Sequence, residues 1–87
     1  MRIDKFLKMS CIFKSRSSAE KLIEDKSILV NGKAVKPSCS IKPGDLIEIS
    51  LLFKKTTYRI LNLPEKNVSK KDAKNLYEIT GEETIEF

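Results

Sequence analysis

The spacing of the apolar side chains changes near residue 26, and this change restricts the fold more than any other feature of the chain. Over residues 3–11 and again over residues 17–25, apolar residues recur every three or four positions, as on one side of a helix. From Ile28 onward they form short β-branched runs or alternate with polar residues, as in strands. Two short helices followed by strands predict an α+β fold, in which both helices pack on a small, mainly antiparallel sheet.

The two predicted helices differ in the signals at their ends. In the second helix, Ser17 and Glu20 fit a Ser-x-x-Glu capping box, so we expect that helix to begin at Ser17. A tight basic link over residues 12–16 joins it to the first helix. On the first helix one side is suited to packing and the other is cationic. The packing side holds Ile3, Phe6, Leu7 and Ser10, and the opposite side holds Arg2, Lys5 and Lys8.

The strands are separated by residues typical of turns. A strand over residues 28–30 leads into Asn31-Gly32, a strong type I′ hairpin signal because both residues tolerate positive φ. Alternation over residues 46–53 predicts a second strand, followed by a turn at Lys54-Lys55 and a partner strand over residues 56–63 that Pro64 ends. We expect the core to include Phe6, Phe13 and Phe53.

A third helix is predicted near the C-terminus. Ser69 and Asp72 form a second cap signal, and Gly81 can end the helix. Its apolar side contains Ala73, Leu76, Tyr77 and Thr80. We expect the acidic residues 82–87 to be frayed.

The positive charge is concentrated in the first half of the chain. Residues 1–42 hold ten Lys or Arg and four Asp or Glu, a net charge of +6, whereas residues 43–87 have a net charge of −1. A basic half joined to a near-neutral half favours one surface that faces a polyanion, with phosphate as the expected target.

Several classes of function find no support. The chain has no histidine, no Gly-rich phosphate loop and no apolar carboxylate pair, so we expect neither an enzyme nor a cofactor or metal site. Cys11 is expected to be a small core residue of the first helix, and both cysteines are expected to be free thiols. No apolar run exceeds three residues, which predicts a cytoplasmic protein with no membrane partner.

The main candidate site is the cationic side of the first helix together with the start of the second. Lys14, Arg16 and Lys21 supply charge there, while Ser17 and its neighbours can donate hydroxyl hydrogen bonds to phosphate oxygens. Lys33 and Lys36 flank the Asn31-Gly32 turn. A solubilising surface explains the same charges about equally well. Tyr58 and Tyr77 fit half-buried positions better than a stacking platform for bases.

The segments RIDKFL, KSRSSAEKLI, VNG and VKPS…IKPGD resemble the S4-like RNA-binding domain, in that family's order and over residues 1 to about 50. The resemblance implies an αL motif, in which two helices and a following β-segment cradle structured RNA. It implies an S4-like domain over residues 1–63, with residues 64–87 forming a C-terminal helix and acidic tail of the same single domain. Cys11 stands where the family commonly has a basic residue. The RNA-contacting residues implied are Arg2, Lys5, Lys8, Lys14, Arg16, Ser17, Lys21, Asn31 and Lys33.

The chain is similar to stand-alone members of that family, and its length and C-terminal segment favour the RqcP branch of ribosome-associated quality-control factors. That branch implies binding of rRNA and tRNA on large ribosomal subunits obstructed by peptidyl-tRNA, by a monomer that supports alanine tailing with a partner of the RqcH/NEMF type. One alternative is the role of the fifteen-kilodalton heat-shock relatives, which recycle free subunits that carry a nascent chain. A second is a protein-interaction adaptor that docks through Ile47, Ile49 and Phe53.

Overall fold

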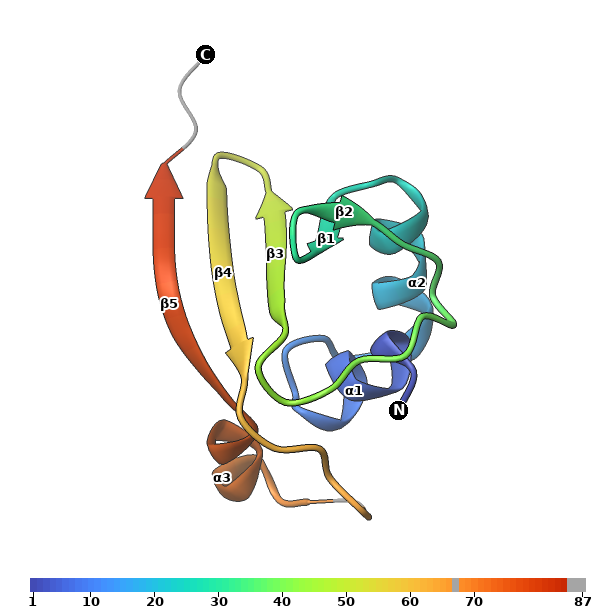
Figure 1. Ribbon diagram of the computed structural model, residues 1–87, viewed down its shortest axis with the longest axis vertical. Helices are drawn as coiled ribbons and strands as arrows, with labels where there is room; N and C mark the ends of the chain where they lie inside the picture. The colour runs from blue at the N-terminus through green and yellow to red at the C-terminus, as the bar shows by residue number, and fades with distance from the viewer. Residues whose placement is uncertain (67, 85–87) are drawn as a thin grey trace.

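The computed structural model describes residues 1–66 and 68–84 and has the predicted α+β architecture (Figure 1). Two helices come first, and four strands follow them. A short helical segment and a last strand complete the described chain. The elements are α1 (Ile3–Met9), α2 (Arg16–Glu24), β1 (Ile28–Val30), β2 (Lys33–Ala34), β3 (Leu46–Leu51), β4 (Lys54–Ile60), α3 (Lys70–Ala73), the 3₁₀ turn η1 (Lys74–Leu76) and β5 (Tyr77–Thr84).

The strands of the described chain form one antiparallel sheet in the order β2-β1-β3-β4-β5. In Figure 1, α1 and α2 lie beside the β1–β3 half of the sheet, while β4 and β5 stand away from them and α3 lies at the foot of these two strands. The molecule is therefore elongated, with extents of 40 × 23 × 22 Å. The two helices and the long β4–β5 pair occupy different parts of the surface.

The core joins the helices to the sheet, as the apolar pattern predicts. Every residue of the predicted packing side of α1 is buried, and on the sheet side Ile28, Ile47 and Ile49 meet them. The first turn of α1 is held from outside the helix, because the N–H of Ile3 donates to the carbonyl of Cys39 at 2.8 Å. Phe6 is fully buried as predicted, and Phe13 is half-buried against the core.

Two helix ends differ from the prediction. The N-cap of α2 is Ser15 instead of Ser17: its hydroxyl accepts the N–H of Ser18 at 3.2 Å, so the helix begins earlier than expected. The first helix ends at Met9, and Cys11 follows it with a φ of 62°. Cys11 is exposed, so its predicted place in the core is wrong; the left-handed turn after α1 directs the chain away from the core.

The predicted hairpin at Asn31-Gly32 is confirmed. Both residues have positive φ, of 52° and 81°, and Val30 pairs with Lys33 across the turn. The side chain of Asn31 also fastens the hairpin to the start of β3, since its carbonyl accepts the N–H of Leu46 and its amide donates to buried Asp45. The structure therefore gives Asn31 a structural role that needs no RNA.

The predicted turn at Lys54-Lys55 is wrong, because the β3–β4 loop consists of Leu52 and Phe53. Leu51 pairs with Lys54, so both lysines belong to β4, which ends at Ile60. Phe53 is a turn residue with 57% of its surface exposed, and its predicted place in the core is also wrong. Apolar residues occupy this turn and cations occupy the strand, the reverse of the usual preference.

Replacing Leu52 by glycine should raise the free energy of unfolding by about 0.5–1 kcal/mol, because a left-handed conformation is costly for a side chain and free for glycine. Leu52 has a φ of 52° and is 89% exposed, so little packing is lost. Urea denaturation checks this. Leu61→Gly is the matched control: Leu61 is outside the left-handed region, and its exchange should lower stability. A loss at both positions would contradict the prediction.

The C-terminal helix is shorter than predicted. The Ser69 cap is confirmed by the N–H of Asp72 donating to its hydroxyl at 3.2 Å, and Ala73 and Leu76 are buried. The helical segment ends there, however, and Tyr77–Thr84 is strand β5. Pairing with the whole of β4 overrides the weaker local preference for helix. The predicted fraying of residues 82–87 is wrong for Glu82 to Thr84, and residues 85–87 lie outside the described chain.

The cysteines are both free, Cys11 exposed and Cys39 half-buried. Among residues 1–66 and 68–84, no group of His, Cys, Asp or Glu is arranged to hold a metal ion. No helix in this part of the chain is long and apolar enough to cross a bilayer.

Candidate RNA interface

The two lysines of the predicted cationic side of α1 are exposed and have no acidic partner among the described residues. Lys5 and Lys8 lie on this side, and Lys14 follows in the link to α2; all three side chains are exposed. Within the described chain none of these ammonium groups forms an ion pair. They are free to meet the charge of an external anion.

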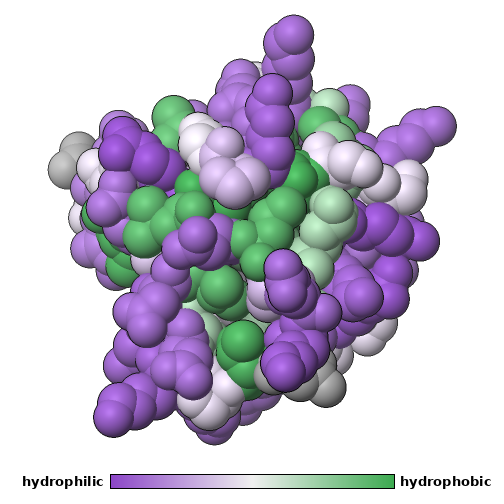
Figure 2. Space-filling model, turned by 60° about the horizontal axis from the view of Figure 1, so that its bottom comes forward, coloured by the Kyte–Doolittle hydropathy of each residue, from purple (hydrophilic) through white to green (hydrophobic). Residues whose placement is uncertain are grey.

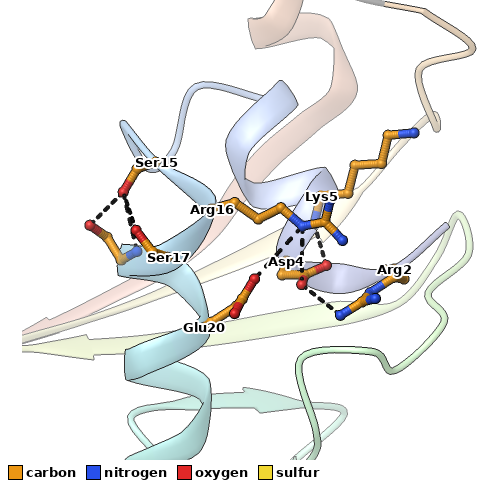
Figure 3. Close-up of polar contacts among 8 residues, drawn as sticks. Arg2, Asp4, Lys5, Ser15, Arg16, Ser17 and Glu20 are labelled. Carbon is orange, nitrogen blue, oxygen red and sulfur yellow. Dashed lines mark hydrogen bonds and ion pairs between the residues drawn. The ribbon is translucent and has the colours of Figure 1, made fainter.

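Arg2 and Arg16 converge on the buried carboxylate of Asp4 (Figure 3). Arg2 Nη2 lies 3.0 Å and Arg16 Nε 3.2 Å from the same oxygen, Asp4 Oδ2, while the N–H of Lys5 donates to Oδ1 at 2.7 Å. The Asp4 side chain is 0% exposed, whereas the two arginines are 48% and 43% exposed. Each guanidinium therefore keeps donors that face solvent, while Asp4 fixes its position.

The electrostatics of Asp4 reflect two opposing effects. Burial alone would raise the pKa of Asp4, but the hydrogen bonds from Arg16 and from the Lys5 N–H, with the charges of Arg16 and Arg2, lower that pKa below its ordinary 3.8. The carboxylate is thus ionised at neutral pH. Asp4 is not among the predicted site residues, although an acid between Arg2 and Lys5 in a basic segment is a usable signal.

This ion pair changes the expected effect of Arg16→Ala. The sequence alone predicts weaker RNA binding with little effect on folding, because an exposed arginine removes no core volume. In the structure Arg16 also stabilises a buried carboxylate and lies 3.8 Å from Glu20. Arg16→Ala therefore affects stability as well as binding, and a lysine such as Lys14 is the cleaner probe.

The serines at the start of α2 divide into one structural and two exposed hydroxyls. Ser15 caps the helix and lies 2.8 Å from the hydroxyl of Ser18 and 3.3 Å from that of Ser17. Ser17 and Ser18 follow Arg16 in the first turn of α2, and both are exposed. The cap that Ser17 was expected to form belongs to Ser15, and the contact of Ser17 with a phosphate stays a prediction.

The predicted site residues do not form one patch. Lys33 and Lys36 belong to the β1–β2 hairpin and the loop after it, and Lys36 lines a hollow with Glu24 and Lys26 at the C-terminal end of α2. Arg16 is at the other end of this helix, which spans roughly 13 Å at 1.5 Å per residue. Lys21 is exposed between them. A ligand that touches all of these residues must be extended along α2.

The cations of β4 provide a contrast within the same molecule. Lys54, Lys55 and Arg59 each have an acidic partner in the sheet, at 3.2, 3.3 and 2.7 Å respectively. The partners are Glu82, Glu48 and Glu78. The cations of β4 are thus neutralised within the sheet, whereas Lys5, Lys8 and Lys14 have no such partner among the described residues.

The two tyrosines are half-buried, as predicted, and pack edge to face with ring centroids 5.3 Å apart. Burial, followed by the charges of Tyr77 and Glu82, raises the pKa of Tyr58 above 10.0. The edge of one ring packs against the face of the other, so we interpret this pair as a structural contact.

The same part of the chain that carries the unpaired cations matches a known family. The S4 domain matches residues 1–47. The chain belongs to the S4-domain family. It is 41% identical to the "RQC P-site tRNA stabilizing factor" of Halalkalibacterium halodurans over 98% of this chain and 96% of that protein. The protein of the same name from Bacillus subtilis is 35% identical, with 98% of each chain covered. The resemblance to the RqcP branch is confirmed.

A solved structure supports the same fold. Heat Shock Protein 15 of Vibrio cholerae, whose structure is described as trimeric, superposes with a TM-score of 0.85 and 29% identity, covering 92% of this chain and 81% of that one. That protein shares the arrangement of helices and sheet found here. The expected fold class is confirmed, and the assignment of individual RNA contacts stays a prediction.

Proposed function

We propose that this S4-domain protein is a non-enzymatic RNA-binding factor that binds rRNA and tRNA on large ribosomal subunits obstructed by peptidyl-tRNA. The observation that carries the proposal is the group of exposed, unpaired cations on α1 and the following link, beside two arginines oriented by Asp4. Cations and hydroxyls without a stacking platform favour readout of RNA shape and phosphates over readout of bases.

The ribosomal part of the proposal rests on the relatives. Proteins that match nearly the whole chain are named for stabilising tRNA in the P site during RQC. We infer a corresponding role in ribosome-associated quality control, where holding the peptidyl-tRNA supports alanine tailing of the stalled chain by a partner of the RqcH/NEMF type.

Two alternatives lead to different expectations. A heat-shock-type recycling role, suggested by the 29% identity to Heat Shock Protein 15, requires binding to free subunits that carry a nascent chain, without a part in tailing. The adaptor hypothesis is weakened, because two residues of its docking face are buried: Ile47 is 0% and Ile49 is 4% exposed.

Co-sedimentation with purified large subunits tests the proposal. The wild-type protein should prefer subunits that carry peptidyl-tRNA over vacant ones, and log K should fall with log[salt] with a slope of about −3 to −4 if about four phosphates are engaged. Lys14→Ala should weaken this binding. The control, Lys55→Ala, removes one charge from the paired cations of β4 and should change binding little.

The outcomes separate the candidate functions. Equal binding to vacant and obstructed subunits would reduce the function to general ribosome binding. A flat salt profile would favour the adaptor, and failure of the wild type to bind either particle would refute the ribosomal proposal.

A further inference from the structure

A hollow brings together cations from both ends of the sequence. It is lined by Lys8 on α1, by Cys11, Phe13 and Lys14 in the link, and by Lys70 on α3, and has a volume of about 360 Å³. A second hollow shares Lys8 and Cys11 and adds Met9 and Val68. The segment after β4 therefore lies directly against the end of α1 and the link.

Figure 2 shows the end of the molecule that carries α3, where hydrophilic side chains project around a strip of apolar ones. The first hollow has this mixed character: its lining contains three lysines together with Phe13, which is half-buried against the core. Apolar walls reduce the screening of nearby charges, so an anion in the hollow interacts more strongly with the lysines than it would in open water.

The charge around the first hollow is not balanced. Lys8, Lys14 and Lys70 all line it, and among residues 1–66 and 68–84 no acidic residue does. Within the described residues none of the three forms an ion pair. Three positive charges around one hollow repel one another, and an anion bound there relieves that repulsion.

The framework of the C-terminal segment fixes the position of Lys70. It follows Ser69, which caps α3, and precedes buried Ala73. The carbonyl of Leu76 accepts the N–H of Leu61 at 2.8 Å, which ties the end of this helical segment to the end of β4. The backbone of Lys70 is thus held in place by residues that lie outside the S4 domain match. That match covers residues 1–47.

We propose that Lys70 joins Lys8 and Lys14 in holding one backbone phosphate of the bound RNA, so that α3 completes the RNA-binding surface begun by the S4 motif. The hollow is roughly twelve times the ~30 Å³ that one water occupies in the liquid, which leaves room for a phosphodiester with part of its sugar. This inference rests on the proposed function, since the phosphate belongs to the RNA proposed above.

The test compares Lys70→Ala with Lys71→Ala in co-sedimentation with large subunits that carry peptidyl-tRNA. Lys71 is the next residue of α3, equally exposed, and does not line the hollow. Lys70→Ala should weaken binding about five- to tenfold at about 0.1 M salt and make the salt slope shallower by about 0.7–0.9, the effect of one lost phosphate contact. Lys71→Ala should stay within about twofold of the wild type.

A double-mutant cycle asks whether the cations share one phosphate. If they do, Lys14→Ala combined with Lys70→Ala should lose less affinity than the product of the two single losses, because the first loss already loosens the phosphate. Losses that multiply, or equal effects at Lys70 and Lys71, would overturn the shared site. If Lys14→Ala weakens binding and Lys70→Ala does not, this inference fails while the proposed function stands.

Alkylation of Cys11 gives a readout that needs no substitution. Cys11 is exposed in the hollow, whereas half-buried Cys39 serves as an internal reference, and peptide mass spectrometry distinguishes the two thiols. Bound subunits should slow the reaction of iodoacetamide with Cys11 several-fold relative to Cys39. An unchanged rate in the bound complex would show that the hollow is not covered by RNA.

Discussion

Asp4→Ala should lower the free energy of unfolding by about 2–4 kcal/mol at neutral pH, since a buried, hydrogen-bonded carboxylate and its partners form a unit. Asp4 is fully buried and bonded to two guanidinium groups and to the N–H of Lys5. Without it, Arg2 and Arg16 lose the group that brings them together. Thermal and urea denaturation followed by circular dichroism measure the change.

The pH dependence identifies the charge of Asp4 as the cause. Its pKa is lower in the folded protein than in the unfolded chain, so its contribution to stability is fully present above the ordinary value of 3.8 and is lost as the pH falls through the folded value. Asp4→Asn, which keeps the size of the side chain, should therefore differ from the wild type most at neutral pH and progressively less below about pH 4.

Glu24→Ala is the matched control for Asp4. Glu24 is an exposed acid on α2 without an ion pair in the described chain, and its loss should change stability by less than about 0.5 kcal/mol at any pH. A cost for Asp4→Ala no larger than this, or a difference for Asp4→Asn that does not depend on pH, would contradict the role assigned to the carboxylate.

The sequence predicted the elements whose signals are local and failed where distant pairing decides. The apolar side of α1 and the Asn31-Gly32 turn follow from spacing and backbone preference, and both are confirmed. Strand β5 was predicted as the end of a helix up to about Thr80 and as a frayed tail from Glu82, because its pairing with β4 is not visible in a window of neighbouring residues. Leu52 and Phe53 were mistaken for strand because the turn they form lacks the usual residues.

The candidate site shows the same division. Charge and spacing located the exposed lysines of α1 and the link, but sequence could not show which cations are neutralised. Arg16 and Lys55 look alike as isolated basic residues, yet one is bonded to a buried carboxylate and the other to Glu48 across the sheet. Lys70 was missed altogether, because only the packing of α3 brings it beside Lys8 and Lys14.

Neutralising Lys5 and Lys8 together by Lys→Gln exchanges should weaken binding to obstructed large subunits about 25- to 60-fold at about 0.1 M salt, because two phosphate contacts are lost and each contributes a counterion-release term of about five- to eightfold. Both side chains are exposed on α1 without an acidic partner in the described residues, and glutamine is a good helix former, so the fold should persist. Co-sedimentation over a range of salt concentrations measures the loss, and the slope should become shallower by about 1.4–1.8.

The matched control makes the same change of net charge elsewhere. Neutralising Lys54 and Lys55 also removes two positive charges, but in the structure these lysines are paired with Glu82 and Glu48 on the sheet. Because exposed ion pairs contribute only about 0–1 kcal/mol each, this variant should also fold. Its affinity should fall by no more than about threefold. Equal losses for the two variants would mean that net charge alone attracts the RNA, and the assignment of its contacts to α1 would then be wrong.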